Sequence, residues 1–293
     1  MQQAPMHVQQ AVPRTMARLV NDNLEIPTIP DVASQALRQM SDPDVTGAQL
    51  ARTISQDQGL TAKVLKVANS ALYALPREVN NLQQAAMILG FTTLKTIVIS
   101  ASCRSIYRRF GMVERALWTH SVATAMAAHT VARKLDLKHR DEAFVAGLMH
   151  DVGKVVMNNG DRERYRQALR LCREENLSSV EAEVKVFGFS HVDVGSILVQ
   201  RWELPPAMEH AVFLHHDTDL AMSVAEEHLE LVYMTHTADR MTHFLGLAPP
   251  YSETVDTLSQ DDAAEALGLD DAHLMALAEE IKELYEKDNS SFA

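Results

Sequence analysis

Apolar residues recur along most of this chain at the three- and four-residue spacing of amphipathic helices. In residues 60–68 and 114–135 this spacing places Leu, Val, Ala and Met on one face. No segment of useful length alternates as a half-buried strand would. The pattern therefore predicts an all-α protein. The expected helices cover about 30–40, 60–68, 82–89, 91–107, 114–135, 141–160, 190–202, 205–216, 223–245 and 261–287. Thr46 can cap a further helix that carries Leu50 and Ile54, Ser178–Glu181 has the pattern of a capping box, and Gly90 ends the helix that begins at Leu82.

A break at Gly111 divides these helices into two groups, because a new amphipathic register begins at Glu114. We therefore expect two contiguous helical units with a boundary near Arg109–Val113. The first is an N-terminal helical bundle at residues 13–110, and it packs on a C-terminal helical domain at residues 111–293.

The composition agrees with packed helices. Hydrophobic residues make up 46% of the chain but aromatic residues only 5%, so Leu, Val, Ala, Ile and Met must form most of the core. The formal net charge is −12, from 27 Lys and Arg against 39 Asp and Glu. This acidic balance disfavours binding to nucleic-acid phosphates and to anionic membranes, so we expect neither as a partner.

Two further features bear on where the protein acts. Cys103 and Cys172 form neither a disulfide framework nor a zinc-finger spacing. No apolar run approaches the roughly 20 residues that span a bilayer, and the N-terminal residues lack the apolar core of a signal peptide. Together these features predict a cytoplasmic protein.

The pair His150–Asp151 interrupts an apolar helical pattern between Phe144 and Lys154. Burying an imidazole and a carboxylate costs free energy unless a partner satisfies both groups. A divalent metal ion is such a partner, which makes this doublet the strongest indication of chemistry in the sequence. Other candidate groups along the chain are His120, His191, His215, His216 and Asp239.

The order of His120, the doublet and Asp239 resembles the HD superfamily of metal-dependent phosphohydrolases. Other motifs, over about residues 24–240, resemble HDOD, the HD-related output domain family of bacterial signalling. This resemblance implies an HD-like helical core, a role in bacterial signal transduction and a signalling protein as partner. The motifs are Ile26–Pro30, Ser41–Asp44, Ile54–Asp57, Leu60–Lys66, Ala68–Tyr73, Ala85–Gly90, Trp118–Ser121, Phe187–His191 and Arg201–Pro205.

The HD resemblance implies a metal site. His and Asp ligands suit Fe, Mn, Zn, Ni or Co and do not select one of them alone. A first divalent ion would be held by His120, His150, Asp151 and Asp239, because neighbouring helices can bring these ligand types together. His236 lies three residues before Asp239 on the same helical face, so we expect it to support these ligands.

A second ion would be held by His191 together with His215 or His216, with Asp151 as the bridge between the ions. An alternative for the His215–His216 pair is a helix C-terminus, where imidazolium is favoured by the helix dipole. Lys154 follows the doublet by three residues and resembles a lysine of the HD-GYP phosphodiesterases, so it is the candidate catalytic residue that stabilises phosphoryl charge.

These features support two function hypotheses. The first is a signal-transduction output protein of the HDOD type that retains an HD-type metal site. The alternative is an active metal-dependent phosphohydrolase, a phosphodiesterase or nucleotidase whose ligand is a nucleotide or cyclic dinucleotide. His216 is followed by Asp-Thr-Asp-Leu, without the Gly-Tyr-Pro signature of HD-GYP proteins, so no particular cyclic dinucleotide is predicted.

Overall fold

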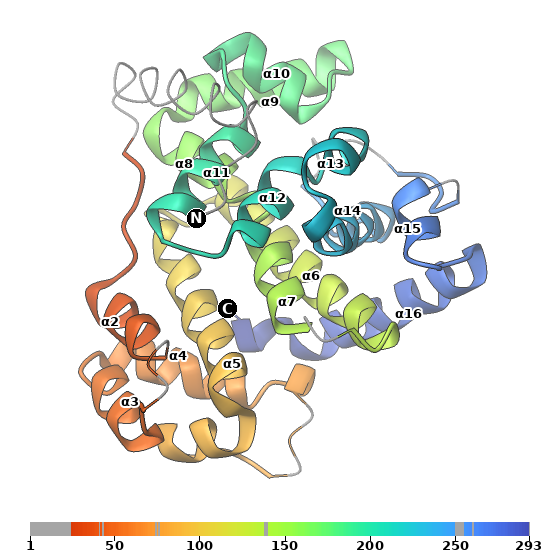
Figure 1. The fold of residues 1–293 in the computed structure, drawn as a ribbon. Helices are drawn as coiled ribbons and strands as arrows, with labels where there is room; N and C mark the ends of the chain where they lie inside the picture. Colours follow the sequence, from red (N-terminus) through yellow and green to blue (C-terminus); the bar gives the residue numbers. More distant parts are fainter. Residues whose placement is uncertain are drawn as a thin grey trace.

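The computed structural model describes residues 25–292, except 41, 43, 74, 76, 138, 139, 250–254 and 260. Within these residues every regular element is a helix, as Figure 1 shows. The all-α fold expected from the apolar spacing is therefore confirmed. The helical signals expected before residue 25 lie outside the described residues.

Local sequence signals explain where the N-terminal helices begin and end. Thr46 and Gln49 form a capping box at the start of α3. The break expected at Gly90 divides α5, because Gly90 has a φ of 80° that other residues rarely adopt. The elements of this half are α2 (Asp31–Gln39), α3 (Gly47–Ile54), α4 (Gln58–Ala68), η1 (Ala71–Tyr73), α5 (Leu82–Cys103) and η2 (Arg104–Ile106).

The remaining helices form the larger part of the fold. Ser178 and Ser190 each start a helix with a capping box, as the sequence predicts for Ser178. The elements are α6 (Met112–Lys134), α7 (Arg140–Met149), α8 (Val152–Gly160), α9 (Arg162–Glu175), α10 (Ser179–Phe187), α11 (His191–Arg201), α12 (Pro206–Leu214), α13 (Thr218–Val224), η3 (Glu226–His228), α14 (Leu229–Phe244), α15 (Asp262–Ala266), α16 (Asp271–Asp288) and η4 (Asn289–Phe292).

Three expected helices are interrupted. The helix expected at 141–160 is two helices, α7 and α8, because the chain turns at His150–Asp151. The helix expected from Ser223 begins at Leu229 instead, after Ala225 leaves the helical conformation with φ −134° and ψ 32°. Apolar periodicity continues through these two interruptions, so periodicity alone does not locate them. The helix expected at 261–287 is also two helices, α15 and α16, because Gly268 between them has a φ of 75°.

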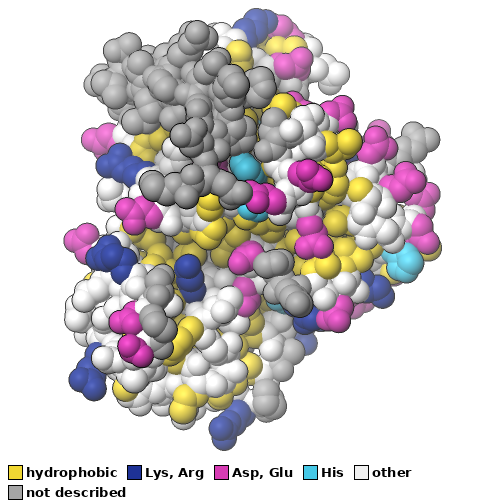
Figure 2. Space-filling view, in the orientation of Figure 1, with side chains coloured by type: hydrophobic (Ala, Val, Ile, Leu, Met, Phe, Trp, Pro, Cys, Tyr) yellow, Lys and Arg dark blue, Asp and Glu magenta, His cyan; other side chains and the backbone are white. Residues whose placement is uncertain are grey.

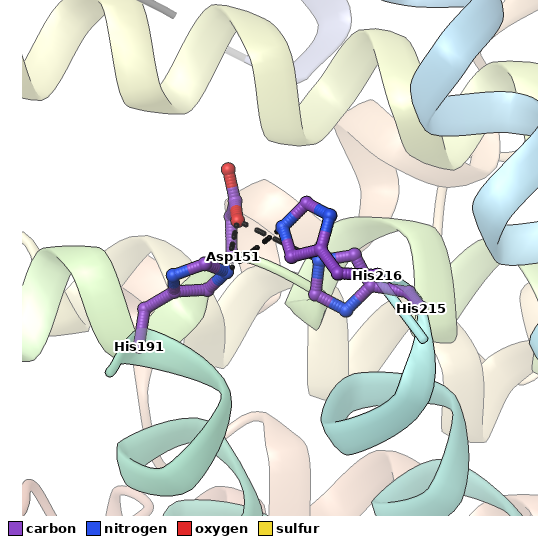
Figure 3. A group of neighbouring side chains, drawn as sticks. All are labelled: Asp151, His191, His215 and His216. Atoms are coloured by element: carbon purple, nitrogen blue, oxygen red, sulfur yellow. Dashed lines mark hydrogen bonds and ion pairs between the residues drawn. The ribbon is translucent and has the colours of Figure 1, made fainter. Parts of the chain in front are cut away.

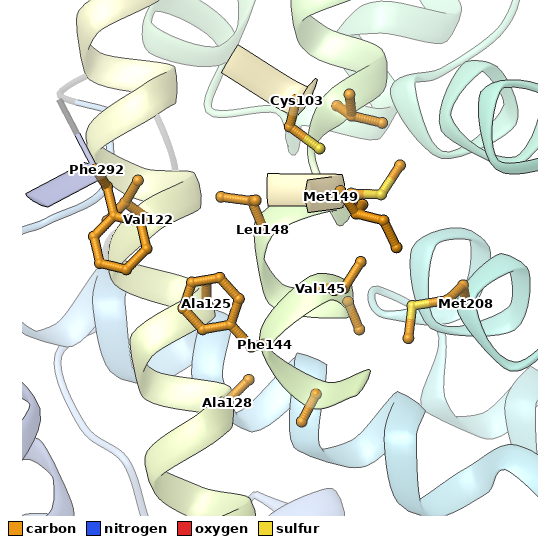
Figure 4. Close-up of a cluster of buried hydrophobic side chains, with 14 of the residues drawn as sticks. Cys103, Val122, Ala125, Ala128, Phe144, Val145, Leu148, Met149, Met208 and Phe292 are labelled. Carbon is orange, nitrogen blue, oxygen red and sulfur yellow. The ribbon is translucent and has the colours of Figure 1, made fainter. Parts of the chain in front are cut away.

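Helices α6 and α7 pack closely against each other, and Figure 4 shows buried apolar side chains between them. Phe144, Val122 and Ala125 lie in this layer and are almost completely buried. Gly147 permits the close approach, because a Cβ atom there would lie 2.6 Å from the Thr124 carbonyl oxygen. Helix α6, which carries His120, and helix α7, which precedes His150–Asp151, are therefore held at a fixed separation.

The C-terminal helix connects the two halves of the chain. It packs against α6, and it also contacts η1 from the N-terminal half. The backbone N–H of Leu72 donates to Asp288 Oδ2 at 3.2 Å, and the indole N–H of Trp118 donates to the Phe292 carbonyl at 3.1 Å. One continuous apolar core runs from Ile26 to Phe292. The division into two helical units near Arg109–Val113 stays a prediction.

Among the described residues, one stretch, Leu82–Ile106, is long and apolar enough to pass a test for a membrane-spanning helix. Its most apolar window is 56% buried inside the structure. The same stretch supplies Leu94, Ile97 and Val98 to the shared core, which accounts for its apolar character.

A substitution at Gly153 tests how α8 and α11 are held together. A Cβ atom at this position would lie 2.0 Å from the His191 carbonyl oxygen, a contact that only movement of the backbone relieves. We expect Gly153→Ala to lower the free energy of unfolding by about 2–3 kcal/mol, measured by urea denaturation of the metal-free protein. Gly59→Ala is the control, because its Cβ atom would meet only the Asp57 side chain at 3.3 Å. Equal urea concentrations at the midpoint of unfolding for the two variants would contradict this account of the packing.

Candidate metal centre

The structure brings every predicted ligand to one place, which we call the His–Asp centre. His120 comes from α6, the His150–Asp151 turn joins α7 to α8, His191 begins α11 and Asp239 lies on α14. His215 and His216 follow the end of α12. The side chains that form the centre are His120, His150, Asp151, His191, His215, His216 and Asp239.

One half of the centre contains the first set of predicted ligands. The Nε2 atom of His120 lies 3.2 Å from the Nε2 atom of His150 and 3.0 Å from Asp239 Oδ1. Asp151 Oδ2 lies 3.5 Å from each of these two imidazole nitrogens. All four side chains are buried. Three imidazole or carboxylate groups within mutual reach are the usual minimum for a transition-metal site.

The other half contains the second set (Figure 3). The Nε2 atoms of His191 and His216 lie 3.2 Å apart. Asp151 Oδ1 lies 3.3 Å from His191 Nε2 and 3.9 Å from His215 Nε2. The carboxylate of Asp151 thus turns one oxygen toward each half, which is the arrangement that a bridging ligand needs.

The outer ring nitrogens of four of these histidines, His120, His150, His191 and His215, are occupied as donors. The Nδ1–H groups of His150 and His215 donate to the carbonyls of Gly147 and Val212, at 2.7 and 2.9 Å. Because a carbonyl only accepts, the neutral rings carry their hydrogen on Nδ1 and leave a lone pair on Nε2. Metal-binding histidines are typically oriented in this way.

His120 and His191 follow the same rule. The Nδ1 atom of His191 donates to the buried Glu183 carboxylate at 2.7 Å. The Nδ1 atom of His120 contacts the Thr242 hydroxyl at 3.3 Å, and that hydroxyl donates onward to the Asp239 carbonyl. The hydroxyl therefore accepts from His120, whose Nε2 lone pair points into the centre.

Several polar atoms in the centre have no hydrogen-bond partner although they are buried. They are Asp151 Oδ1, His215 Nε2 and Asp239 Oδ1. An unpaired buried polar atom costs about 1–3 kcal/mol. Three such atoms in one small volume, each a good ligand for a transition metal, fit a cation better than any arrangement of hydrogen bonds within the chain.

The electrostatics of the centre also favour a cation. Burial alone would lower the pKa of His150, but the Asp151 and Asp239 carboxylates raise it to about 10. Burial lowers the pKa of His120 to about 4, although Asp239 opposes this. The two carboxylates thus create a negative potential around the His150 ring, which favours a positive charge there, either the ring's own proton or a metal ion that displaces it.

Lys154, the predicted catalytic residue, lies on α8 with its ammonium group 2.8 Å from Asp151 Oδ2. Burial would raise the pKa of Asp151, but Lys154, His150 and His191 hold it well below its usual range. Lys154 therefore keeps the central carboxylate ionised and fixes its orientation. Its ammonium group contacts the protein rather than open space.

Two contributors were not predicted as part of the site. Glu183 is buried and accepts from both the backbone N–H and the ring of His191, at 2.7 Å each. It shares the inward face of α10 with Ala182 and Phe187, and a carboxylate in such an apolar stripe was the signal that could have revealed it. His243 Nε2 lies 3.5 Å from Asp239 Oδ1, one helical turn along α14.

His236 supports a ligand, as its position on the face of Asp239 suggested. Its Nδ1–H donates to the carbonyl of His215 at 2.6 Å. Its Nε2 atom lies 3.6 Å from the carboxylate of Asp261, which also caps α15. His236 thus fixes the backbone of His215 rather than contributing to the centre itself.

The fold and the centre together define an all-α protein with a buried histidine–aspartate cluster that could hold metal. The HDOD domain model matches residues 26–218, and the chain belongs to the HDOD family. The match ends before α14, so Asp239 and His243 lie outside it.

Comparison with other proteins agrees with this fold. An HDOD domain protein of unknown function from Geobacter sulfurreducens is 28% identical, with a TM-score of 0.74 over 94% of this chain and 97% of that chain. A candidate phosphohydrolase from Shewanella amazonensis SB2B is 21% identical, with a TM-score of 0.70 over 98% and 97%.

A relative from Treponema pallidum (strain Nichols), an uncharacterized protein, is 24% identical over 240 residues. These cover 81% of this chain but 46% of the relative, so the chain spans about half the length of that relative.

Glu183 offers a test of how the centre is oriented. We expect Glu183→Gln to weaken divalent-metal affinity by about 10- to 100-fold, because a neutral amide no longer stabilises the His191 ring as a ligand. Titration with Mn²⁺ or Zn²⁺, followed by calorimetry, measures the change. Glu181→Gln on the same helix is the matched control, since Glu181 is exposed. Equal affinities for the two variants would remove Glu183 from the site.

Proposed function

We propose that this HDOD protein holds two divalent metal ions in the His–Asp centre and uses them to hydrolyse a phosphate ester in a signalling role. One observation carries the proposal. The imidazole rings of the centre surround the carboxylate of Asp151, which turns one oxygen toward each half of the centre. A single structural ion would leave half of these groups unused. The candidate phosphohydrolase from Shewanella amazonensis has the same fold, which is consistent with this proposal.

His120, His150 and Asp239 would bind one ion, and His191, His215 and His216 the other, with Asp151 between them. When bound, such a pair of ions activates water and neutralises charge on both sides of an in-line displacement at phosphorus. The residues of the chain orient the ligands and exclude water from the buried half. Lys154 holds Asp151 ionised and so preserves the bridge.

A purely signalling role is the second candidate, because the chain belongs to the HDOD family. The centre would then bind metal, or metal with a nucleotide, as an input rather than as a catalyst. The N-terminal helices α2–α5 share the core with α6 and α7, so they are the part that would relay such an input to a signalling partner.

Metal binding is the first test. At a metal concentration about 100 times Kd, binding to the folded state alone adds about 2.7 kcal/mol of stability. For a chain of this size we expect Tm to rise by about 5 °C or more on adding Mn²⁺ or Zn²⁺ to the chelated protein. His150→Ala with Asp151→Ala should abolish both the rise and the metal content measured by elemental analysis. The exposed residue His273 provides the control, as His273→Ala, and a rise that survives in the double variant would refute the assignment.

Hydrolysis is the second test. We expect metal-loaded protein to cleave generic phosphomonoesters or phosphodiesters, and His191→Ala to lose this activity with the second ion. Lys154→Met should lower kcat by about 10- to 100-fold and lower metal content much less, because Lys154 orients the Asp151 carboxylate without being a ligand itself. Equal weak rates for wild type and His191→Ala would indicate contamination. The signalling role would then stand alone.

A further inference from the structure

The His–Asp centre meets the surface at His216. His120, His150, His191 and His215 are fully buried, at 0% exposure each, whereas the side chain of His216 is exposed. Figure 2 shows histidine and acidic side chains next to one another on this face of the molecule. A molecule that reaches the centre from this face therefore passes His216.

A cleft of about 450 Å³ adjoins His216. This volume lies within the range of roughly 300–1,000 Å³ that is typical of small-molecule sites. The starts of α10 and α11, the end of α12, and α13 enclose the cleft. Its apolar wall consists of the half-buried side chains of Val192, Phe213 and Leu220.

The charged part of the cleft is acidic. Glu181 and Asp217 both line it, and none of its described lining residues is Lys or Arg. Glu181 Oε2 accepts a hydrogen bond from the Ser178 backbone N–H at 2.9 Å. Asp217 Oδ1 accepts one from the Leu220 backbone N–H at 2.9 Å. Each carboxylate is thus fixed through one of its oxygens. The structure shows no ion pair between either carboxylate and a cation in the described part of the chain. The cleft is therefore poorly suited to a second phosphate.

We propose that this cleft binds the alcohol part of the substrate, and that this part carries a positively charged amine on a short apolar body. The inference rests on the proposed function, because it places the phosphate at the His–Asp centre and the alcohol beyond His216. Glu181 and Asp217 attract the amine, the Phe213 ring adds a cation–π contact, and Val192 and Leu220 contact the apolar body.

The reaction is the hydrolysis of a phosphomonoester. The oxygen of a water molecule forms a bond to phosphorus, and the bond from phosphorus to the alcohol oxygen breaks. The alcohol oxygen takes up a proton, so the products are the amino alcohol and inorganic phosphate. No oxidant, reductant or further reactant is required. The class of substrate is thus a small phosphorylated amino alcohol rather than a polyphosphate.

Choline and its uncharged isostere 3,3-dimethylbutanol provide the binding test, and it needs no metal. Saturation-transfer NMR on the whole protein should detect choline with an affinity about tenfold higher than that of the isostere, because the two differ only in charge. Glu181→Gln with Asp217→Asn should remove this preference. Both substitutions keep their helix caps, since Gln serves in a capping box and Asn at an N-cap.

The matched control is Glu174→Gln with Asp219→Asn, which changes the net charge equally with exposed carboxylates that do not line the cleft. This control should retain the preference for choline. Equal binding of choline and the isostere by the wild type, or an unchanged preference in the Glu181/Asp217 variant, would overturn the proposal whatever the metal content proves to be.

Phosphocholine and 3,3-dimethylbutyl phosphate provide the corresponding kinetic test on metal-loaded protein. We expect kcat/KM to favour phosphocholine by about tenfold in the wild type and to become equal in the Glu181/Asp217 variant at unchanged metal content. Hydrolysis of both esters at equal rates would overturn the amine specificity and leave the proposed function intact. If the protein bound no divalent metal, the proposed function would be refuted. The binding test with choline would still decide the role of the cleft.

Discussion

The buried carboxylate of Asp151 is the group on which the rest of this structure depends. It lies 2.8 Å from an ammonium group and faces imidazoles from both halves of the centre. An ionised carboxylate without such partners would cost several kcal/mol to bury. The helices α6, α8 and α11 and the segment after α12 must therefore pack so that their polar groups meet at this point. The remaining buried faces of these helices carry apolar side chains, so one apolar core surrounds the centre.

The sequence predicts most of the helices because their limits are local. Thr46, Ser178 and Gly90 act through their own backbone neighbours, and the structure shows each acting as a cap or a break. The turn at His150–Asp151 is different. There the His150 ring donates to the Gly147 carbonyl, and the Asp151 oxygens face residues far along the chain. Tertiary contacts of this kind override apolar periodicity, so one continuous helix was the wrong expectation.

The sequence also identified most residues of the His–Asp centre. Ligand types and their order identified the residues that converge, since imidazole and carboxylate groups seldom lie on apolar helix faces without a partner. The apolar stripe of α10 could have marked Glu183 as buried, but its bond to His191 and the cleft beside His216 depend on how α10 packs against α11, which no local pattern encodes. His243 was not among the predicted ligands, although its four-residue spacing from Asp239 places both on one face of α14.

The bond between Leu72 and Asp288 joins residues that are 216 positions apart. Contacts of such long sequence separation form late, because the intervening chain must first be ordered. During synthesis the N-terminal helices therefore leave the ribosome long before the helix that completes their packing against α6 exists. We expect the nascent first half to expose the apolar surface that α16 and η4 later cover, and so to rely on the cell's chaperones in the meantime.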